Sequence, residues 1–204
     1  MWYFGFGANI NPWKLREKRK IIPIEQVPGK LAGWRLSFNH TGGMGNIEQL
    51  DSPTLTNPGP DEVHGMLLHL TTEDFSKLSQ IEYEYSTAEV RVAAYDGREI
   101  LAKAFVTPPE WKLPKSVAPP ERYLKLIRDG CDSMGIAAEY QQWLKSLDSS
   151  PLAPTVVFFS LIERANAQNA ADPVYWVGMV WSASYALARP RAEATRPDER
   201  PGQG

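Results

Sequence analysis

The start of the chain constrains its fold more than any other segment. Its apolar, aromatic residues predict a buried strand over residues 1–7, which breaks into the turn Gly5-Phe6-Gly7-Ala8-Asn9. Glycine lets a backbone turn sharply and approach a ligand closely, because it has no Cβ. Successive amide groups in such a turn form a concavity that binds carboxylate or phosphate oxygens. The segment therefore predicts a strand that leads into an anion-binding loop.

Strand and helix patterns follow one another along the next 140 residues. Apolar runs predict strands over residues 31–38, 63–70, 90–95 and 100–106, and Asp96-Gly97 predicts a hairpin turn between the last two. Helical spacing predicts helices after a Thr71 cap, from Pro120, and over residues 137–147. The pattern indicates a mixed α/β (α+β) domain.

Three connecting segments also have distinct compositions. Pro28-Gly29 predicts a turn, and the basic run Lys14 to Lys20 is expected to form the solvated face of a short helix. Residues 107–120 contain five prolines, so they are expected to form a long irregular loop that acts as a lid or binding loop.

Composition narrows the classes of function. A formal net charge of -2 over 204 residues argues against a nucleic-acid partner. The lone Cys131 excludes an internal disulfide and a cysteine-rich zinc site, and the three histidines lack the spacing of metal ligands. No charged and apolar leader pattern opens the chain. We therefore expect a soluble, cytoplasmic globular protein without a bound metal.

The C-terminal part differs in composition from the rest. We expect a domain over residues 1–148, an apolar helical extension over 149–188, and a disordered tail over 189–204. The apolar stretch 174–188 is shorter than the roughly 20 residues of a membrane span. Packing against the domain or a homodimer partner is favoured over association with a membrane surface.

The order of the motifs resembles the γ-glutamylcyclotransferase family, which has the AIG2-like fold. Residues 3–9 resemble its Tyr-Phe-Ala-Tyr-Gly-Ser-Asn opening, and Val63-His64-Gly65-Met66-Leu67 resembles its Val-Trp-Gly-Val-Val strand. Gly42-Gly43, a glutamate at the end of a helix (Glu82), and Pro119-Pro120-Glu121-Arg122-Tyr123 follow in register. The resemblance covers about residues 2–147. It implies a twisted mixed sheet that closes into a small barrel with flanking helices.

The resemblance also implies a reaction that needs no cofactor. The α-amine of a γ-glutamyl amide or peptide attacks its own γ-carbonyl and releases 5-oxoproline and an amine, a lyase reaction of glutathione metabolism. One carboxyl can remove the proton from the attacking amine and then protonate the leaving amine. Glu82 matches that acid/base. Glu84 stays as the alternative, because in a strand it shares a face with Glu82.

The same resemblance implies the residues that bind substrate. They are the loop residues Tyr3, Phe4, Gly5, Phe6, Gly7, Ala8 and Asn9, together with Tyr85 and Tyr123. Three family hydroxyls are missing, because Phe6, Ala8 and Phe105 stand where the family has Tyr, Ser and Tyr. A less polar site favours γ-glutamyl amines or γ-glutamylated natural products as substrates. The alternative is a catalytically silent relative that binds a small γ-glutamyl-like ligand as a sensor or scaffold.

Overall fold

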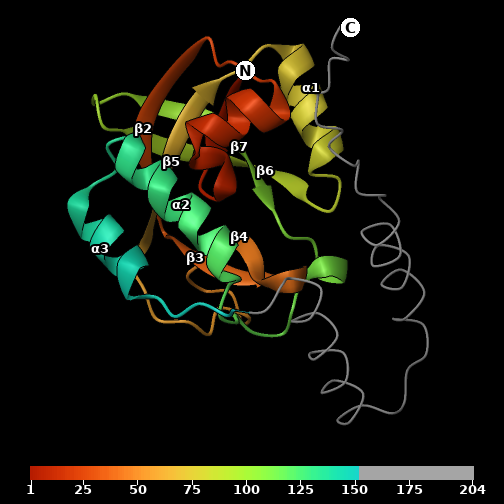
Figure 1. Cartoon of the computed structure of the whole chain (residues 1–204), viewed down its shortest axis with the longest axis vertical. Coiled ribbons are helices and arrows are strands. Elements are labelled where there is room, and N and C mark those ends of the chain that lie inside the picture. The colour runs from red at the N-terminus through yellow and green to blue at the C-terminus, as the bar shows by residue number, and fades with distance from the viewer. Residues whose placement is uncertain (152–204) are drawn as a thin grey trace, which may run out of the picture. The chain divides into compact units, whose positions relative to one another are not determined.

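The computed structural model describes residues 1–151, which form a closed five-stranded barrel with flanking helices (Figure 1). The barrel strands are β1 (Trp2–Gly5), β5 (Glu62–His69), β2 (Glu25–Ala32), β6 (Ser86–Ala94) and β7 (Glu99–Val106), in that spatial order. Neighbouring strands are antiparallel except β1 and β7, whose parallel pairing closes the barrel at Tyr3 and Lys103. The mixed fold and the small barrel expected from the sequence are therefore confirmed.

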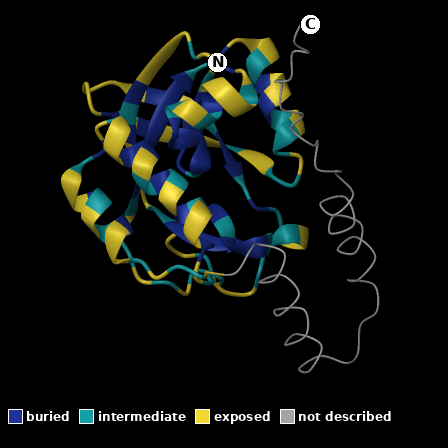
Figure 2. Ribbon diagram, viewed as in Figure 1, coloured by how far each residue is buried: buried dark blue, intermediate teal, exposed yellow. Residues whose placement is uncertain are grey.

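Burial follows from the pattern of each strand. β5 is an almost continuous apolar run, and it lies between β1 and β2, where residues 63–68 are all buried. β6 alternates instead, with Val90, Val92 and Ala94 inward and charged or small residues outward. Figure 2 shows the buried residues concentrated in the barrel strands and the exposed ones on the outer faces of the helices. This difference is the one expected between a strand buried on both faces and a strand with one solvated face.

The Pro28-Gly29 turn predicted from the sequence is wrong. Both residues lie inside β2, and the chain turns at Gly33, where φ is 78°. A Cβ on Gly29 would lie 2.9 Å from Val92 Cγ1, so glycine here leaves room for this side chain of the neighbouring strand β6. The pairing of β2 with β6 begins next to Pro28, whose carbonyl accepts from the Tyr95 N–H at 2.8 Å. The two residues therefore belong to a pair of strands and not to a turn.

A second, two-stranded sheet lies beside the barrel. Its strands are β3 (Trp34–His40) and β4 (Met44–Gln49), joined by the short 3-10 turn η3 (Thr41–Gly43). Gly42-Gly43, one of the motifs of the family resemblance, therefore lies in this turn, directly before β4. The Phe38 N–H and the Thr41 hydroxyl tie the sheet to the proline-rich loop, through Ser116 and the Trp111 carbonyl.

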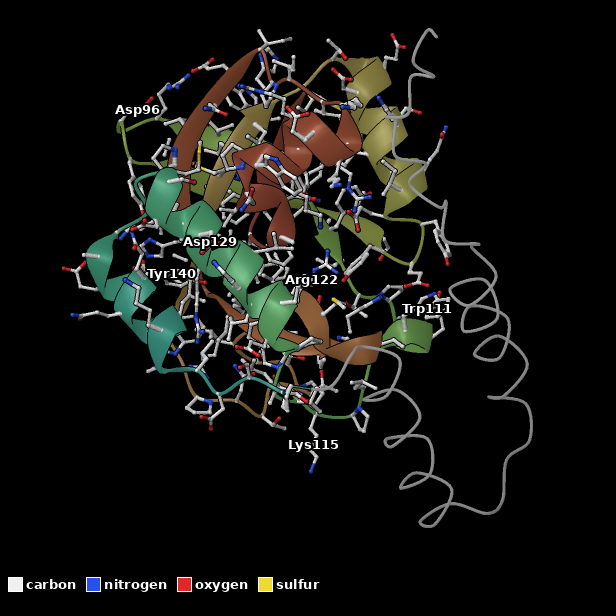
Figure 3. The ribbon with its side chains drawn as sticks, viewed as in Figure 1. Asp96, Trp111, Lys115, Arg122, Asp129 and Tyr140 are labelled. Carbon is white, nitrogen blue, oxygen red and sulfur yellow. The ribbon has the colours of Figure 1, made fainter. Side chains whose placement is uncertain are left out.

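Three α-helices cover the barrel (Figure 1). α1 (Thr72–Ile81) begins at the predicted cap, where Thr71 Oγ1 accepts from the Asp74 N–H at 3.0 Å. α2 (Glu121–Ser133) and α3 (Ala138–Ser146) pack on each other, and Figure 3 shows Arg122 and Asp129 on α2 and Tyr140 on α3. All three were expected from helical spacing.

The remaining segments are short. They comprise the 3-10 turns η1 (Ala8–Ile10) and η4 (Pro109–Trp111) and the π-helical turn η2 (Lys14–Arg19). The Ser150 carbonyl, at the start of the predicted extension, accepts from the Glu121 N–H at 2.9 Å. The rest of the predicted extension, from residue 152, and the predicted tail lie outside the described residues. Within the described part, none of the helices has the length and apolar character needed to span a membrane.

Candidate functional site

Glu82 lies where α1 ends, and its side chain turns toward the N-terminal loop. It caps the helix, with its N–H donating to the Leu78 carbonyl at 3.0 Å. Its carboxylate Oε1 accepts from Asn9 Nδ2 at 3.2 Å, and only 17% of the side chain is exposed. The same Asn9 amide donates to the Tyr3 hydroxyl at 3.3 Å. A buried asparagine from η1 thus links the carboxylate of Glu82 to the barrel strand β1.

The basic run predicted to be a solvated helix face instead contributes to this cluster. Arg19 Nη2 lies 2.9 Å from Glu82 Oε1, and 21% of the Arg19 side chain is exposed. Lys14 is also partly buried, whereas Arg16, Glu17 and Lys18 are exposed. The prediction holds for those three residues and is wrong for Lys14 and Arg19. The π-helical winding of η2 explains the difference, because sequence patterns alone assume α-helical spacing.

The Tyr123 hydroxyl lies between the N-terminal loop and the start of β4. Its oxygen accepts from the Gly45 N–H at 2.9 Å and from the Ala8 N–H. A Cβ on Gly7 would lie 2.8 Å from this oxygen, and one on Gly45 would lie 2.7 Å from it, so both positions are close-packed against the phenol. Burial raises the pKa of Tyr123 to about 12, so the hydroxyl keeps its proton. That proton is available to a further acceptor.

Aromatic rings form one wall of the cluster. The Phe105 ring centroid lies 5.2 Å from that of Tyr3 and 6.5 Å from that of Tyr85. The Tyr85 hydroxyl donates to the Gly45 carbonyl at 3.2 Å. Burial raises the pKa of both Tyr3 and Tyr85, and the Glu82 charge contributes in the same direction. Glu82 therefore lies among neutral phenols.

Glu84 has different partners from Glu82. Its Oε2 lies 3.2 Å from His40 Nε2, and its Oε1 accepts from the Tyr83 hydroxyl at 3.0 Å. The hydrogen bond with His40 lowers the pKa of Glu84, which holds it as a carboxylate. The His40 ring is buried and stacks on Tyr85 with centroids 4.2 Å apart. Both glutamates of this segment are therefore partly buried, but only Glu82 contacts the N-terminal loop.

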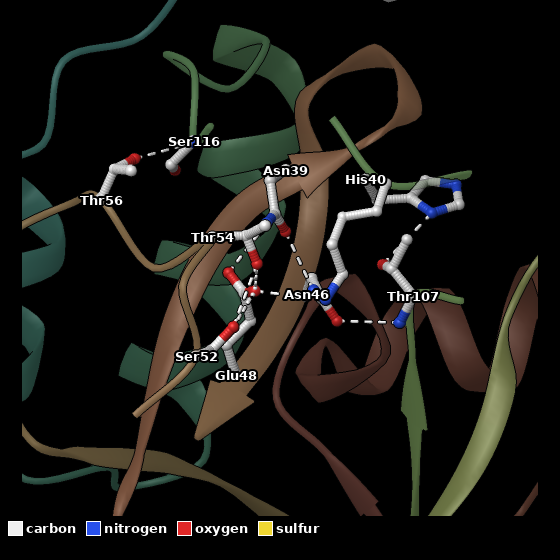
Figure 4. Close-up of polar contacts among 10 residues, drawn as sticks. Asn39, His40, Asn46, Glu48, Ser52, Thr54, Thr56, Thr107 and Ser116 are labelled. Carbon is white, nitrogen blue, oxygen red and sulfur yellow. Dashed lines mark hydrogen bonds and ion pairs between the residues drawn. The ribbon is translucent and has the colours of Figure 1, made fainter. Parts of the chain in front are cut away.

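A buried polar network supports the β3–β4 side of the site (Figure 4). Asn46 Oδ1 accepts from the Thr107 N–H at 2.8 Å, and Asn46 Nδ2 donates to Asn39 Oδ1 at 2.9 Å. Asn39 in turn donates to Glu48 at 2.8 Å, and His40 Nδ1 lies 3.3 Å from the Thr107 hydroxyl. Because each buried polar group here has a partner, the network fixes the backbone that presents Gly45.

Glu48 is the most buried carboxylate of this network. Hydrogen bonds from Ser52 and Thr54, and the charge of Lys112, outweigh desolvation and hold its pKa below the usual value. A pocket of about 430 Å³ lies beside it, with Trp34, Thr107 and Lys112 among its lining residues. Both carboxylate oxygens of Glu48 have hydrogen-bond partners within the protein, which is typical of a structural carboxylate.

The predicted site residues fall into two groups. Tyr3, Asn9, Glu82, Tyr85 and Tyr123 come together, with Gly7 and Ala8 against the Tyr123 hydroxyl. Phe4 and Gly5 lie in the barrel strand β1 and Phe6 follows it directly; all three are buried, and the Phe4 and Phe6 rings pack with centroids 6.4 Å apart. Among the described residues no group of histidine, cysteine or carboxylate side chains could hold a metal ion.

Sequence reasoning missed four residues of the site. Lys14 and Arg19 were assigned to solvent, and Gly45 and His40 received no role. His40 stands directly before the glycine-rich segment, and that position is the one signal that could have singled it out. His64, by contrast, is a buried structural histidine whose Nε2 lies 2.9 Å from Glu62 Oε1.

The chain is similar in sequence and in fold to known proteins. The model of the AIG2-like family matches residues 62–144. Human γ-glutamylcyclotransferase is 25% identical over 159 residues, covering 72% of this chain and 78% of the human protein. The bovine protein of the same name is 26% identical over 156 residues, with the same coverage. A solved structure titled γ-glutamyl cyclotransferase superimposes with a TM-score of 0.61 at 21% identity, covering 80% of this chain and 98% of that one.

Proposed function

Because the chain belongs to the AIG2-like family of γ-glutamylcyclotransferase-like proteins, we propose that it cyclises a γ-glutamyl amide to 5-oxoproline and a free amine. The observation that carries the proposal is the placement of Glu82. This carboxylate is largely buried, contacts Asn9 of the N-terminal loop, and lies among phenols that stay neutral.

The proton transfers require one group that can act twice. Glu82 accepts a proton from the α-ammonium of the substrate, and the freed amine attacks the γ-carbonyl carbon. A C–N bond forms, and the amide C–N bond then breaks as Glu82 returns its proton to the leaving nitrogen. The attacking nitrogen loses its second proton to the released amine, which departs as an ammonium, and the ring keeps one N–H. Atoms and charges balance without a co-reactant, and a single carboxyl within reach of both nitrogens suffices. Asn9 and Arg19 hold the carboxylate in position through Oε1.

Negative charge develops on the carbonyl oxygen during the attack. Tyr123 is a suitable donor to it, because its oxygen already accepts from the Gly45 and Ala8 amides while its own proton stays available. Two such N–H bonds polarise the phenol and strengthen the hydrogen bond that it donates. A fixed donor of this kind stabilises the tetrahedral intermediate without reorganising.

The aromatic wall bears on the choice of substrate. Phe105 and Phe6 stand where the family has hydroxyls. The Phe105 ring packs against Tyr3, with centroids 5.2 Å apart, and against Phe75, whose ring lies parallel at 5.9 Å. A wall of this composition offers apolar surface and few donors to the leaving group. We therefore infer that γ-glutamyl amines with apolar leaving groups react better than glutathione-like peptides.

The direct test is a survey of substrates. The full chain is incubated with a panel of γ-glutamyl amines and γ-glutamyl peptides, and release of 5-oxoproline is followed by mass spectrometry. Turnover of any member, with an amine released in equal amount, supports the proposal. Saturable binding without turnover across the panel contradicts it and favours a silent binding protein, an outcome consistent with the three missing hydroxyls.

A further inference from the structure

Three cations of the π-helical turn η2 have no carboxylate partner in the described chain, and Lys14 is the one among them that is partly buried, because Arg16 and Lys18 are exposed. Glu17 pairs with Lys20 at 3.6 Å, and Arg19 pairs with Glu82 at 2.9 Å. Among residues 1–151, no carboxylate lies within the 4.0 Å ion-pairing distance of the Lys14 ammonium. Lys14 is nevertheless partly buried. A partly buried, unpaired ammonium is costly unless it meets an anion.

The winding of η2 places this charge beside Glu82. A π-helix forms hydrogen bonds between residues five apart, as from the Lys20 N–H to the Leu15 carbonyl. Lys14 and Arg19 are also five apart, so both lie on the same side of the turn. Burial and the Arg19 charge lower the pKa of Lys14 to about 8, while the Glu82 charge raises it. Lys14 thus shares the side of the turn that carries Arg19, the residue that pairs with Glu82.

Two polar atoms next to Glu82 are buried without a hydrogen-bond partner in the described part of the chain. They are Asn9 Oδ1 and Arg19 Nε. Asn9 uses its amide nitrogen on Glu82 and Tyr3, so its free atom is an acceptor, while the free atom of Arg19 is a cationic donor. Buried polar atoms in proteins almost always have partners, so each of these two atoms has the capacity to bind a water molecule or a polar group of a ligand.

These free groups complement the head of an α-amino acid. An unpaired ammonium and a guanidinium N–H suit a carboxylate, and a free amide oxygen beside a carboxylate suits an ammonium. We propose that Lys14, together with Arg19, binds the α-carboxylate of the γ-glutamyl group, and that Asn9 Oδ1 accepts from its α-amino group. This inference rests on the proposed function and assigns specificity for a free α-carboxylate to η2.

The placement has a consequence for catalysis. With its carboxylate on Lys14 and its amino group on Asn9, the substrate directs its nucleophilic nitrogen toward Glu82. Asn9 already contacts the Glu82 carboxylate at 3.2 Å, so a group on its free oxygen lies near the proton acceptor. Lys14 and Asn9 are thus positioning residues, and Glu82 moves the proton.

The test measures binding, so it does not depend on turnover. Calorimetry on the full chain compares two probes, L-glutamine, which has a free α-carboxylate, and L-glutaminamide, in which that group is a neutral amide. Lys14→Met removes the charge and keeps the length of the side chain. We expect its affinity for L-glutamine to fall by about 10-fold to 100-fold, with no change for L-glutaminamide. Lys14→Arg should retain most of the affinity.

Lys18→Met is the matched control. Lys18 belongs to the same turn but is exposed, with its ammonium 5.1 Å from the Trp13 ring, so its loss should leave both affinities unchanged. Lys14→Gln serves as a second neutral variant, and circular dichroism verifies that each variant is folded. The proposal is overturned if wild-type protein binds both probes equally or neither, or if the neutral variants lower both affinities alike.

The outcomes separate this inference from the proposed reaction. If wild type prefers the free α-carboxylate and Lys14→Met loses that preference while no 5-oxoproline is released, the subsite is retained and the reaction is rejected. Turnover with a KM that Lys14→Met leaves unchanged would retain the reaction and reject the subsite.

Discussion

The contact between Gly7 and the Tyr123 hydroxyl makes a quantitative prediction. A Cβ at position 7 would lie 2.8 Å from the phenol oxygen, closer than real Cβ contacts. The phenol is partly buried and two backbone amides hold its oxygen, so it must shift and weaken its bonds from Gly45 and Ala8. Overpacking and loss of a buried hydrogen bond together should lower the free energy of unfolding of Gly7→Ala by about 2–4 kcal/mol.

The double mutant isolates the cause. Tyr123→Phe removes the oxygen that the new methyl group would meet, so Gly7→Ala should cost less than about 1 kcal/mol in that background. The coupling energy between the two positions is then about 2 kcal/mol, of the size measured for residues in contact. Tyr123→Phe alone is also destabilising, because two buried amides lose their acceptor.

Urea unfolding of the four proteins measures the cycle, with an unchanged m value required for the comparison. Gly97→Ala is the control, because its φ of 92° makes alanine unfavourable although nothing lies within 4 Å of its Cβ. Its cost should be the same in both backgrounds. Equal costs of Gly7→Ala with and without the phenol oxygen would refute the close packing of loop and phenol.

Three further predictions concern stability. Asn46→Ala leaves the buried Thr107 N–H without an acceptor, so urea unfolding should show a loss of about 2–3 kcal/mol. Gly29→Ala places a methyl group 2.9 Å from Val92 Cγ1 and should lower the melting temperature, at a cost of about 1–3 kcal/mol. The pKa of Lys14 is about 8 in the folded protein and higher when unfolded, so protonated Lys14 costs stability below pH 8. Between pH 8 and 10.5 the unfolded chain holds the Lys14 proton more tightly than the folded chain, so the free energy of unfolding of wild type should rise by about 1–3 kcal/mol relative to that of Lys14→Met. Parallel curves of unfolding free energy against pH for the two proteins would contradict this.

Much of the fold follows from local patterns. The apolar run of β5, the Thr71 cap and the Asp96-Gly97 hairpin are determined by residues close together in the sequence, and all three were predicted. The prediction of a turn at Pro28-Gly29 was wrong because the role of Gly29 depends on Val92, more than 60 residues away. The Val92 side chain requires a residue without a Cβ at position 29. Local turn preference cannot contain that information.

Only some residues of the candidate site could likewise be predicted from the sequence. Resemblance to the family identified Asn9, Glu82 and Tyr123, and the structure brings Asn9 to Glu82 and the Ala8 amide to the Tyr123 hydroxyl. Lys14 and Arg19 could not be assigned, because a charged run of seven residues is normally a solvated helix face. Only the π-helical winding of η2 turns these two residues inward. Such winding has no recognisable signature in the composition of the run.

The choice between Glu82 and Glu84 tests the account most directly. Release of 5-oxoproline is measured for Glu82→Gln and Glu84→Gln with whichever panel substrate reacts fastest, after circular dichroism confirms that both variants are folded. Because Glu82 contacts Asn9 and Arg19 while Glu84 contacts His40 and Tyr83, we predict that Glu82→Gln reduces the rate by about 10²-fold to 10⁴-fold and Glu84→Gln by less than about tenfold. Full activity in Glu82→Gln would contradict the central claim.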